Sequence, residues 1–386
     1  MKKIYIKIIS MGLFILLLTG CFFNVNIPGL SSSSRKYVPP SDDVVIKLLE
    51  RYRGKSTEEL FDLSLDLTKR GKYKESYNVA KLLLEMGEID LAIAAYSLMG
   101  GNYLLAGGFE KSKYYNEKAL ADIEKLEYLD DKAFVLYYAG TMYYNLSVRD
   151  DWRYASEGIE SFEKSLYKWL HYPDKRSIAS TICSFLNWFY FESPEHFDAE
   201  KAADYAYKPL TFGPAAGIDF DSIWYSVAMA HLVAGDYESA EEFVERYITR
   251  PPIRQYNRNA LHLFYRTVKG DMDMAKELAD SMKRVEPFGN APFSKTARLF
   301  GYPMLGFYSE AIGDTEAAKE YYYEYINSDE GLINANTKFI VDAEERLGMD
   351  FSEARTRLMQ EIIDGRSISL ELAGVEDEAA IALGFV

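Results

Sequence analysis

The chain has 386 residues, with 44 basic and 59 acidic side chains and a formal net charge of −15. This acidic balance argues against nucleic acid or an anionic lipid surface as a partner, and it suits a soluble body or a basic partner. The two cysteines, Cys21 and Cys183, cannot provide a disulfide framework if Cys21 is used otherwise. The fold must therefore depend on its hydrophobic core.

The N-terminus reads MKKIYIKIISMGLFILLLTGCFFN. Three lysines precede or open an apolar run over residues 8–18, which is shorter than the roughly 20 residues needed to span a bilayer. Small residues close the run, as in a cleavable export signal. The sequence Leu18-Thr19-Gly20-Cys21 resembles a bacterial lipobox, in which cleavage falls before the cysteine and its sulfur carries a lipid.

The resemblance implies a signal peptide over residues 1–20 and lipidation of Cys21. Residues 21–43, rich in serine and proline, are expected to form a flexible tether. The body would lie outside the cytoplasm, anchored in the membrane by lipid. Phe22 follows the cysteine where inner-membrane retention often uses aspartate, so the outer membrane is favoured if the organism has two. The alternative is an ordinary signal peptide with a chance cysteine.

From residue 44 onward the chain has helical periodicity and lacks strand signals. One sequence pattern recurs, in which an apolar helix ends at glycine and a small residue follows five positions later inside a second helix. The glycines are Gly71, Gly107, Gly235, Gly270 and Gly313, and the small residues are Ser76, Ser112, Ala240, Ala275 and Ala318. Glycine suits the end of the first helix because it adopts positive φ without a Cβ clash.

The recurring pattern resembles the tetratricopeptide repeat, a pair of helices with the motif W-x₂-L-G-x₂-Y, A-x₃-F and P. The copy at residues 221–252 carries Trp224, Val227, Ala228, His231, Ala240, Val244 and Pro252 at the corresponding positions. In three further copies the pattern begins at Tyr96, Tyr302 and Leu60. The turn over residues 147–158 is longer and lacks the glycine step, and the first helix of residues 174–210 cannot be placed in register.

The resemblance implies an all-α fold, a right-handed α-solenoid of about seven tetratricopeptide-like pairs within residues 44–328. A loop is expected around residues 286–295, because the spacing from Gly270 to Gly313 exceeds the usual period. Helices near residues 332–347 and 350–365 are expected to cap the array, so residues 329–386 form a C-terminal cap and tail.

No sequence motif predicts catalysis, a metal or a cofactor. His171, His196, His231 and His262 are scattered, without metal-ligand spacing, and Cys183 has the apolar neighbours of a buried structural thiol. We therefore expect no enzyme activity, although an enzyme carried on the repeats is a third possibility after the two binding functions below.

In tetratricopeptide arrays the first helices line a concave groove. A helical wheel places Tyr137, Thr141, Tyr144, Tyr225, Met229 and Phe307 on that side, and the alternative is that each contacts a neighbouring helix instead. The expected function is a membrane-anchored scaffold that binds a protein or peptide in an envelope assembly or transport complex. The alternative is a lipid-anchored accessory protein that binds a solute or glycan.

Overall fold

The computed structural model describes residues 52, 54–85, 89–172, 176–212, 220–249, 255–284, 301–328 and 331–366. These residues form sixteen α-helices and no β-strand, so the predicted all-α class is confirmed for them. The predicted signal peptide, Cys21, the tether, Pro252, the loop at residues 286–295 and the tail from residue 367 lie outside the described residues.

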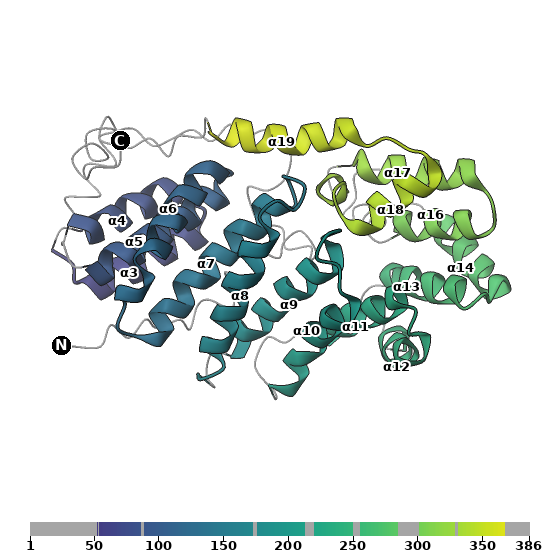
Figure 1. Cartoon of the computed structure of the whole chain (residues 1–386), viewed down its shortest axis with the longest axis horizontal. Coiled ribbons are helices and arrows are strands. Elements are labelled where there is room, and N and C mark those ends of the chain that lie inside the picture. The colour runs from purple at the N-terminus through teal and green to yellow at the C-terminus, as the bar shows by residue number, and fades with distance from the viewer. Residues whose placement is uncertain are drawn as a thin grey trace. The chain divides into compact units, whose positions relative to one another are not determined.

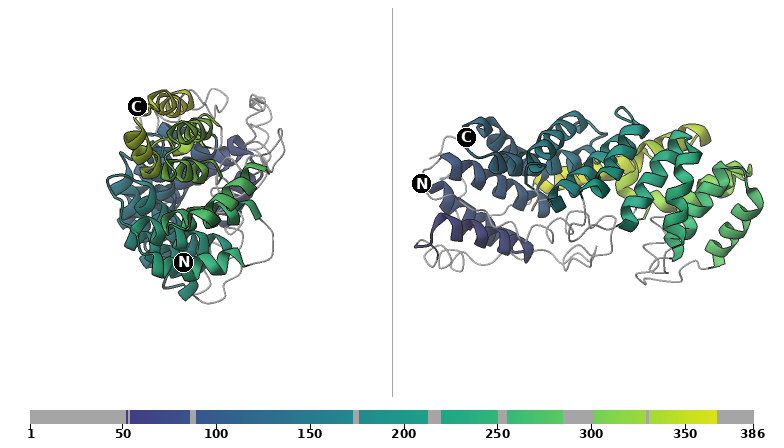
Figure 2. Two further views of the ribbon diagram at one scale, coloured as in Figure 1. Left: turned by 90° about the vertical axis from the view of Figure 1, so that its right-hand side faces the viewer. Right: turned by 90° about the horizontal axis from the view of Figure 1, so that it is seen from below.

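The chain divides into two compact units. Unit 1 comprises residues 1–146, 156–173 and 360–386, and unit 2 comprises residues 147–155 and 174–359. The helices of unit 1 are α3 (Thr57–Lys69), α4 (Tyr73–Glu85), α5 (Ile89–Leu105), α6 (Phe109–Ala121), α7 (Leu129–Ser147) and α8 (Ala155–Trp169), with a short 3₁₀ helix, η3 (Ile123–Lys125). Helices α3 to α6 each pack against the next in chain order (Figures 1 and 2).

Unit 2 begins its helical succession at α9. Its helices are α9 (Arg176–Glu192), α10 (Ala199–Thr211), α11 (Phe220–Ala234), α12 (Tyr237–Ile248), α13 (Gln255–Val268), α14 (Met272–Arg284), α16 (Tyr302–Ala311), α17 (Thr315–Ile326) and α18 (Lys338–Leu347), with a 3₁₀ helix, η6 (Leu332–Asn334). Helix α19 (Ser352–Arg366) belongs to unit 2 as far as Met359 and to unit 1 from Gln360.

The five predicted glycine turns have the expected backbone conformation. The φ angles of Gly71, Gly107, Gly235, Gly270 and Gly313 are 71°, 86°, 76°, 76° and 81°. Each glycine lies between two helices, and the small residue five positions later is fully buried in the second one. The recurring sequence pattern therefore predicted both the left-handed turn and the close packing that follows it.

Glycine also permits close helix packing away from the turns. A Cβ atom on Gly140 of α7 would lie 2.8 Å from ring carbons of Phe162 on α8, and Phe162 is fully buried. Within α16, a Cβ on Gly306 would lie 2.9 Å from the ring of Tyr322 on α17. Both contacts join a first helix to the second helix that follows it, so the aromatic ring fills the space that a side chain would need.

Two predicted regions differ from expectation in detail. In residues 174–210, whose first helix had no clear register, that helix is α9, and the expected second helix is α10, which ends at Thr211. The helix predicted near residues 332–347 begins only at Lys338, because residues 332–337 form η6 and a polar turn instead. That turn is anchored by hydrogen bonds from the Asn334 side chain to Tyr325 and from the Asn336 side chain to Val148, which helical periodicity does not reveal.

Candidate functional site

The groove residues predicted on α7 are mainly core residues. Tyr137 and Thr141 are fully buried, and the Thr141 Oγ1 hydroxyl donates to the Tyr137 carbonyl oxygen at 2.9 Å. The Tyr137 ring lies 6.1 Å from that of Phe162 on α8. Tyr144, two turns further from Tyr137, is half-buried. The alternative of helix packing therefore describes Tyr137 and Thr141, whereas Tyr144 keeps a partly accessible ring.

In unit 2, Tyr225, Met229 and Phe307 share one large apolar cluster. Met229 is buried, and Tyr225 and Phe307 are half-buried against the cluster. The Tyr225 ring lies 5.6 Å from that of Tyr247 on α12, and burial raises the pKa of the Tyr225 hydroxyl. The structure thus brings these three predicted residues into one cluster, but that cluster also includes the C-terminal part of the chain.

The C-terminal segment (residues 331–351) packs on first helices of unit 2. The Phe339 ring on α18 lies 6.5 Å from Phe264 on α13 and 6.4 Å from Phe307 on α16. It also lies 6.2 Å from Tyr322 on α17. Behind Phe339, Ile340 is buried in the same apolar cluster. We call the surface made by Phe264, Phe307, Tyr322 and the neighbouring Glu310 the receiving face.

Glu310 supplies the polar end of the receiving face. Its carboxylate accepts the Tyr322 hydroxyl at 2.7 Å and two groups of Arg346 on α18, Nε at 3.0 Å and Nη2 at 3.2 Å. The Glu310 side chain is only 14% exposed. Its carboxylate raises the pKa of the Arg346 guanidinium through this hydrogen bond. A planar, two-donor contact of this kind selects arginine over lysine.

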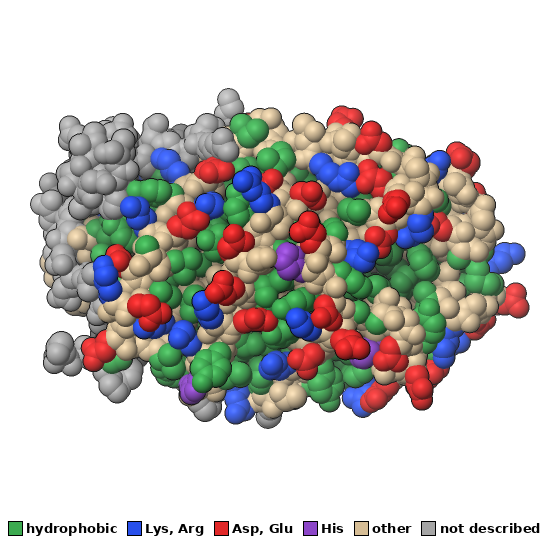
Figure 3. Space-filling model, viewed as in Figure 1, with side chains coloured by type: hydrophobic (Ala, Val, Ile, Leu, Met, Phe, Trp, Pro, Cys, Tyr) green, Lys and Arg blue, Asp and Glu red, His purple; other side chains and the backbone are tan. Residues whose placement is uncertain are grey.

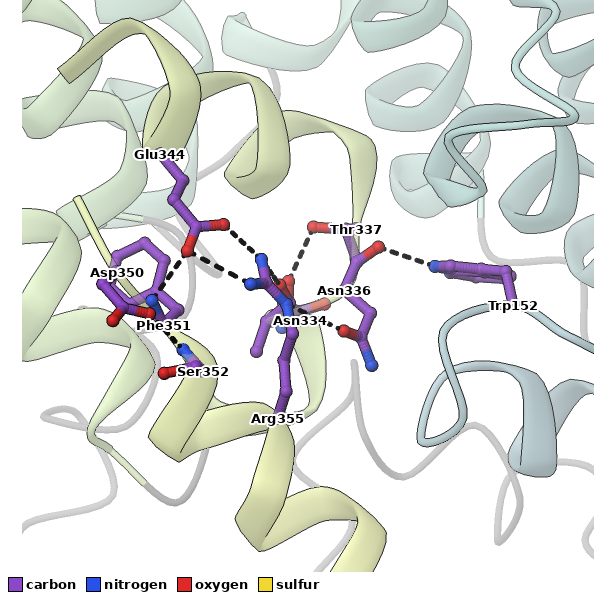
Figure 4. Close-up of polar contacts among 10 residues, drawn as sticks. Trp152, Asn334, Asn336, Thr337, Glu344, Asp350, Phe351, Ser352 and Arg355 are labelled. Atoms are coloured by element: carbon purple, nitrogen blue, oxygen red, sulfur yellow. Dashed lines mark hydrogen bonds and ion pairs between the residues drawn. The ribbon is translucent and has the colours of Figure 1, made fainter. Parts of the chain in front are cut away.

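Arg355 joins the C-terminal segment to α19, as Figure 4 shows. Its guanidinium donates to both carboxylate oxygens of Glu344 on α18, through Nη1 at 3.1 Å and through Nη2. It also donates to Asn336 Oδ1 at 3.1 Å and to the Ala335 carbonyl oxygen at 3.2 Å. The Phe351 amide donates to Glu344 Oε1 at 2.7 Å. One side chain therefore fixes both ends of α18 relative to α19.

Asn336 extends this network to the turn between α7 and α8. The Trp152 indole Nε1 donates to the Asn336 carbonyl oxygen at 2.7 Å, and Asn336 Nδ2 donates to the Val148 carbonyl oxygen at 3.2 Å. Trp152 and Asn336 are almost fully buried. Figure 4 shows the indole pointing at the turn that carries Asn336. We call Trp152, Asn336, Glu344 and Arg355 the latch.

The latch includes a strained backbone. Asp151 and Trp152 have φ angles of 44° and 58°, a region that residues other than glycine rarely adopt. Such a residue costs about 1–3 kcal/mol and persists only where its surroundings hold it. The turn has its own backbone hydrogen bonds, including Trp152 N–H to the Ser147 carbonyl oxygen at 2.8 Å, and the hydrogen bond from the indole to Asn336 adds a restraint from the C-terminal segment.

A second polar contact holds η6. Asn334 Nδ2 donates to the Tyr325 hydroxyl at 2.7 Å, and both residues are buried. Burial raises the pKa of Tyr325, and the nearby Glu192 carboxylate and Tyr225 act in the same direction. Tyr325 therefore stays neutral and serves as a hydrogen-bonding and packing group beside the predicted groove residue Tyr225.

The described residues offer little that points to chemistry. Among them, no group of three or more histidine, cysteine or acidic side chains is placed to hold a metal ion. Within the same residues, no helix has both the length and the apolar character needed to cross a bilayer. On the face seen in Figure 3, acidic and basic side chains are interspersed among apolar ones.

Sequence reasoning missed the latch and the receiving face. Trp152 and Asn336 are separated by 184 positions, so no local pattern links them. The only signal was indirect: the turn that carries Trp152 departs from the glycine step of the other pairs.

Comparison of the chain with protein-family models and with curated proteins gives no match.

Proposed function

We propose that the protein is a lipid-anchored, extracytoplasmic scaffold with tetratricopeptide-like architecture that binds a protein or peptide partner. Taking the helices from α3 to α14, then α16 and α17, two by two gives seven pairs, which supports the repeat interpretation. The five left-handed glycine turns and the buried small residues that follow them support it further. The lipobox-like sequence at Cys21 supports the anchor.

One observation supports binding of a helical or extended polypeptide above other ligands. The receiving face already holds a helix, through three aromatic rings and a paired carboxylate. A surface that accommodates α18 in this way has the chemistry of a helix-binding site. A solute- or glycan-binding role would need a site of a different kind, with several polar groups converging on one small ligand.

The partner-binding proposal can be tested by photo-crosslinking in cells. A photoreactive amino acid at Tyr144, a half-buried position on the first helix α7, is expected to capture a discrete protein. The control position is Tyr167, which is 67% exposed on the second helix α8. Equal crosslinking at the two positions, or none at either together with thermal stabilisation by a glycan, would overturn the scaffold role.

The anchor proposal has a separate test. We expect Cys21→Ser to abolish incorporation of a labelled fatty acid and to move the protein from the membrane fraction to the soluble fraction. Continued membrane association of this variant, with the wild type unprocessed, would contradict the lipobox interpretation.

A further inference from the structure

The receiving face and the C-terminal segment have complementary chemistry. On α18, Phe339, Ile340, Ala343, Arg346 and Leu347 lie at helical spacings of one, four, seven and eight from the first, which places them on one side. Ile340 and Ala343 are buried, Phe339 and Leu347 pack on the core, and Arg346 meets Glu310. The helix thus presents an aromatic group and an arginine to matching groups.

The same segment is held by apolar and polar contacts together. Its outer side carries charged residues, including Lys338 and Asp342, which pair with each other at 2.9 Å. Its buried apolar residues are Leu332, Ala335, Ile340, Ala343, Met349 and Phe351, and its polar contacts include the Asn334–Tyr325 hydrogen bond, the Arg346 pair and the latch. Release of α18 uncovers apolar surface, which a partner helix with matching side chains would cover again.

The strained turn is joined to the segment by one hydrogen bond from its indole. While the segment is docked, the hydrogen bond from Trp152 to Asn336 adds to the backbone hydrogen bonds within the turn. When the segment leaves, the turn loses this bond and keeps its backbone hydrogen bonds. A partner that displaces the segment must therefore replace its contacts with the receiving face.

We propose that the receiving face is a binding site for an amphipathic partner helix with α18-like chemistry, and that the C-terminal segment blocks it in cis until the latch opens. The partner carries an aromatic residue, an aliphatic residue next to it, a small residue four positions on and an arginine seven positions on. This inference specifies the kind of partner that the proposed scaffold binds. Its role in the cell rests on the proposed function, whereas the binding site itself does not.

The position of Glu310 predicts that the partner helix carries an arginine, and not a lysine, opposite it. Without Arg346, Glu310 would keep the Tyr322 hydroxyl but lose its cationic partner in a mostly buried position. A partner helix with lysine would offer one donor direction in place of the paired Nε and Nη2 donors. A partner without the aromatic residue would leave Phe264 and Phe307 uncovered.

The test uses the mature chain (residues 21–386, with Cys21→Ser) and a fluorescein-labelled peptide of residues 335–350. Arg355→Met breaks the latch, and Arg357→Met is the control, because Arg357 is exposed on the same helix. The apparent dissociation constant is the intrinsic one divided by the open fraction, so opening the latch strengthens peptide binding. Fluorescence anisotropy is expected to show at least tenfold tighter binding to Arg355→Met than to wild type or Arg357→Met.

Two peptides define specificity: Phe339→Ala and Arg346→Ala are each expected to weaken binding to the Arg355→Met protein at least tenfold. Equal affinity of the unchanged peptide for all three proteins, or no loss with the two altered peptides, overturns the proposal.

A measurement on the wild type covers the case in which Arg355→Met does not fold. Excess peptide is expected to accelerate amide exchange in α18 while α16 and α17 keep their protection. Unchanged exchange in α18 at saturating peptide overturns the proposal. Peptide binding alongside equal crosslinking at Tyr144 and Tyr167, or alongside no crosslinking and thermal stabilisation by a glycan, would instead retain the site and reject the scaffold role.

Discussion

The contribution of the Trp152 hydrogen bond can be isolated by comparing two tryptophan-to-phenylalanine substitutions. Trp152 donates to the buried carbonyl of Asn336 at 2.7 Å. Trp169 is fully buried as well, but its Nε1 has no hydrogen-bond partner in the part of the chain that the structure describes. Trp152→Phe removes ring volume and a hydrogen bond, whereas Trp169→Phe removes ring volume and an unpaired donor.

The expected costs follow from these differences. The smaller ring leaves a cavity that costs about 1 kcal/mol at either position. At residue 152, the Asn336 carbonyl also loses its indole donor, which costs about 1–3 kcal/mol more for a buried acceptor. We therefore expect Trp152→Phe to lower the free energy of unfolding of unit 2 by about 2–4 kcal/mol. Trp169→Phe should cost about 1 kcal/mol or less, because it removes an orphaned polar group.

Amide hydrogen exchange is the suitable assay, because a chain with two compact units need not unfold in one transition. Trp152→Phe is expected to accelerate exchange most strongly in α18, where the latch acts. Urea unfolding followed by circular dichroism gives the accompanying global change. Equal losses for Trp152→Phe and Trp169→Phe, with α18 protected as in the wild type, would refute the reasoning that the indole hydrogen bond holds the segment.

Three further predictions concern groups away from the latch. Gly140→Ala should lower the free energy of unfolding by about 1–3 kcal/mol in urea titrations, because the new Cβ would meet the buried Phe162 ring at 2.8 Å. Cys183 should resist thiol reagents in the native Cys21→Ser chain and react in urea, because burial raises the pKa of its thiol to about 12. His262 accepts a hydrogen bond from Arg266 Nε at 2.9 Å, and burial lowers its pKa below 6.5. The unfolded state therefore binds more protons than the folded state. The stability contributed by neutral His262 is present above pH 6.5 and is lost as pH falls. His262→Asn should reduce this loss of stability, which urea titrations at neutral and mildly acidic pH measure.

Each of these has a contrary outcome. An unchanged urea midpoint for Gly140→Ala would mean that the α7–α8 contact yields without cost. Rapid labelling of Cys183 in the native chain would mean that α9 opens readily. The same decline in stability between neutral and mildly acidic pH for wild type and His262→Asn would mean that other groups govern the pH dependence.

Local chemistry made the helical turns predictable. A glycine that ends an apolar helix, followed by a small residue after one and a half turns, requires only short-range geometry, and Gly71 and Gly313 adopt the conformation that this geometry demands. The burial of Cys183 followed from its apolar neighbours in the same way. These features depend on residues a few positions apart, which the sequence displays directly.

The candidate site was much less predictable, because its contacts join distant segments. The wheel placed Phe307 on the side of the first helices, but it could not show that Phe339 would pack against it. It also assigned Tyr137 and Thr141 to a groove, although both are buried between helices. Helical periodicity identifies which side of a helix is apolar, but several neighbours can satisfy an apolar side equally well.

The acidic balance of the chain gives the receiving face a further property. With a net charge of −15, the protein attracts basic helices over a distance of about 8–10 Å at moderate salt. At the receiving face itself, the partner's arginine must displace Arg346 from Glu310, where one ion pair replaces another and the net electrostatic gain is small. Salt should therefore slow association of the partner helix while changing its dissociation little. Aromatic contacts with Phe264 and Phe307 then decide which basic helix stays bound.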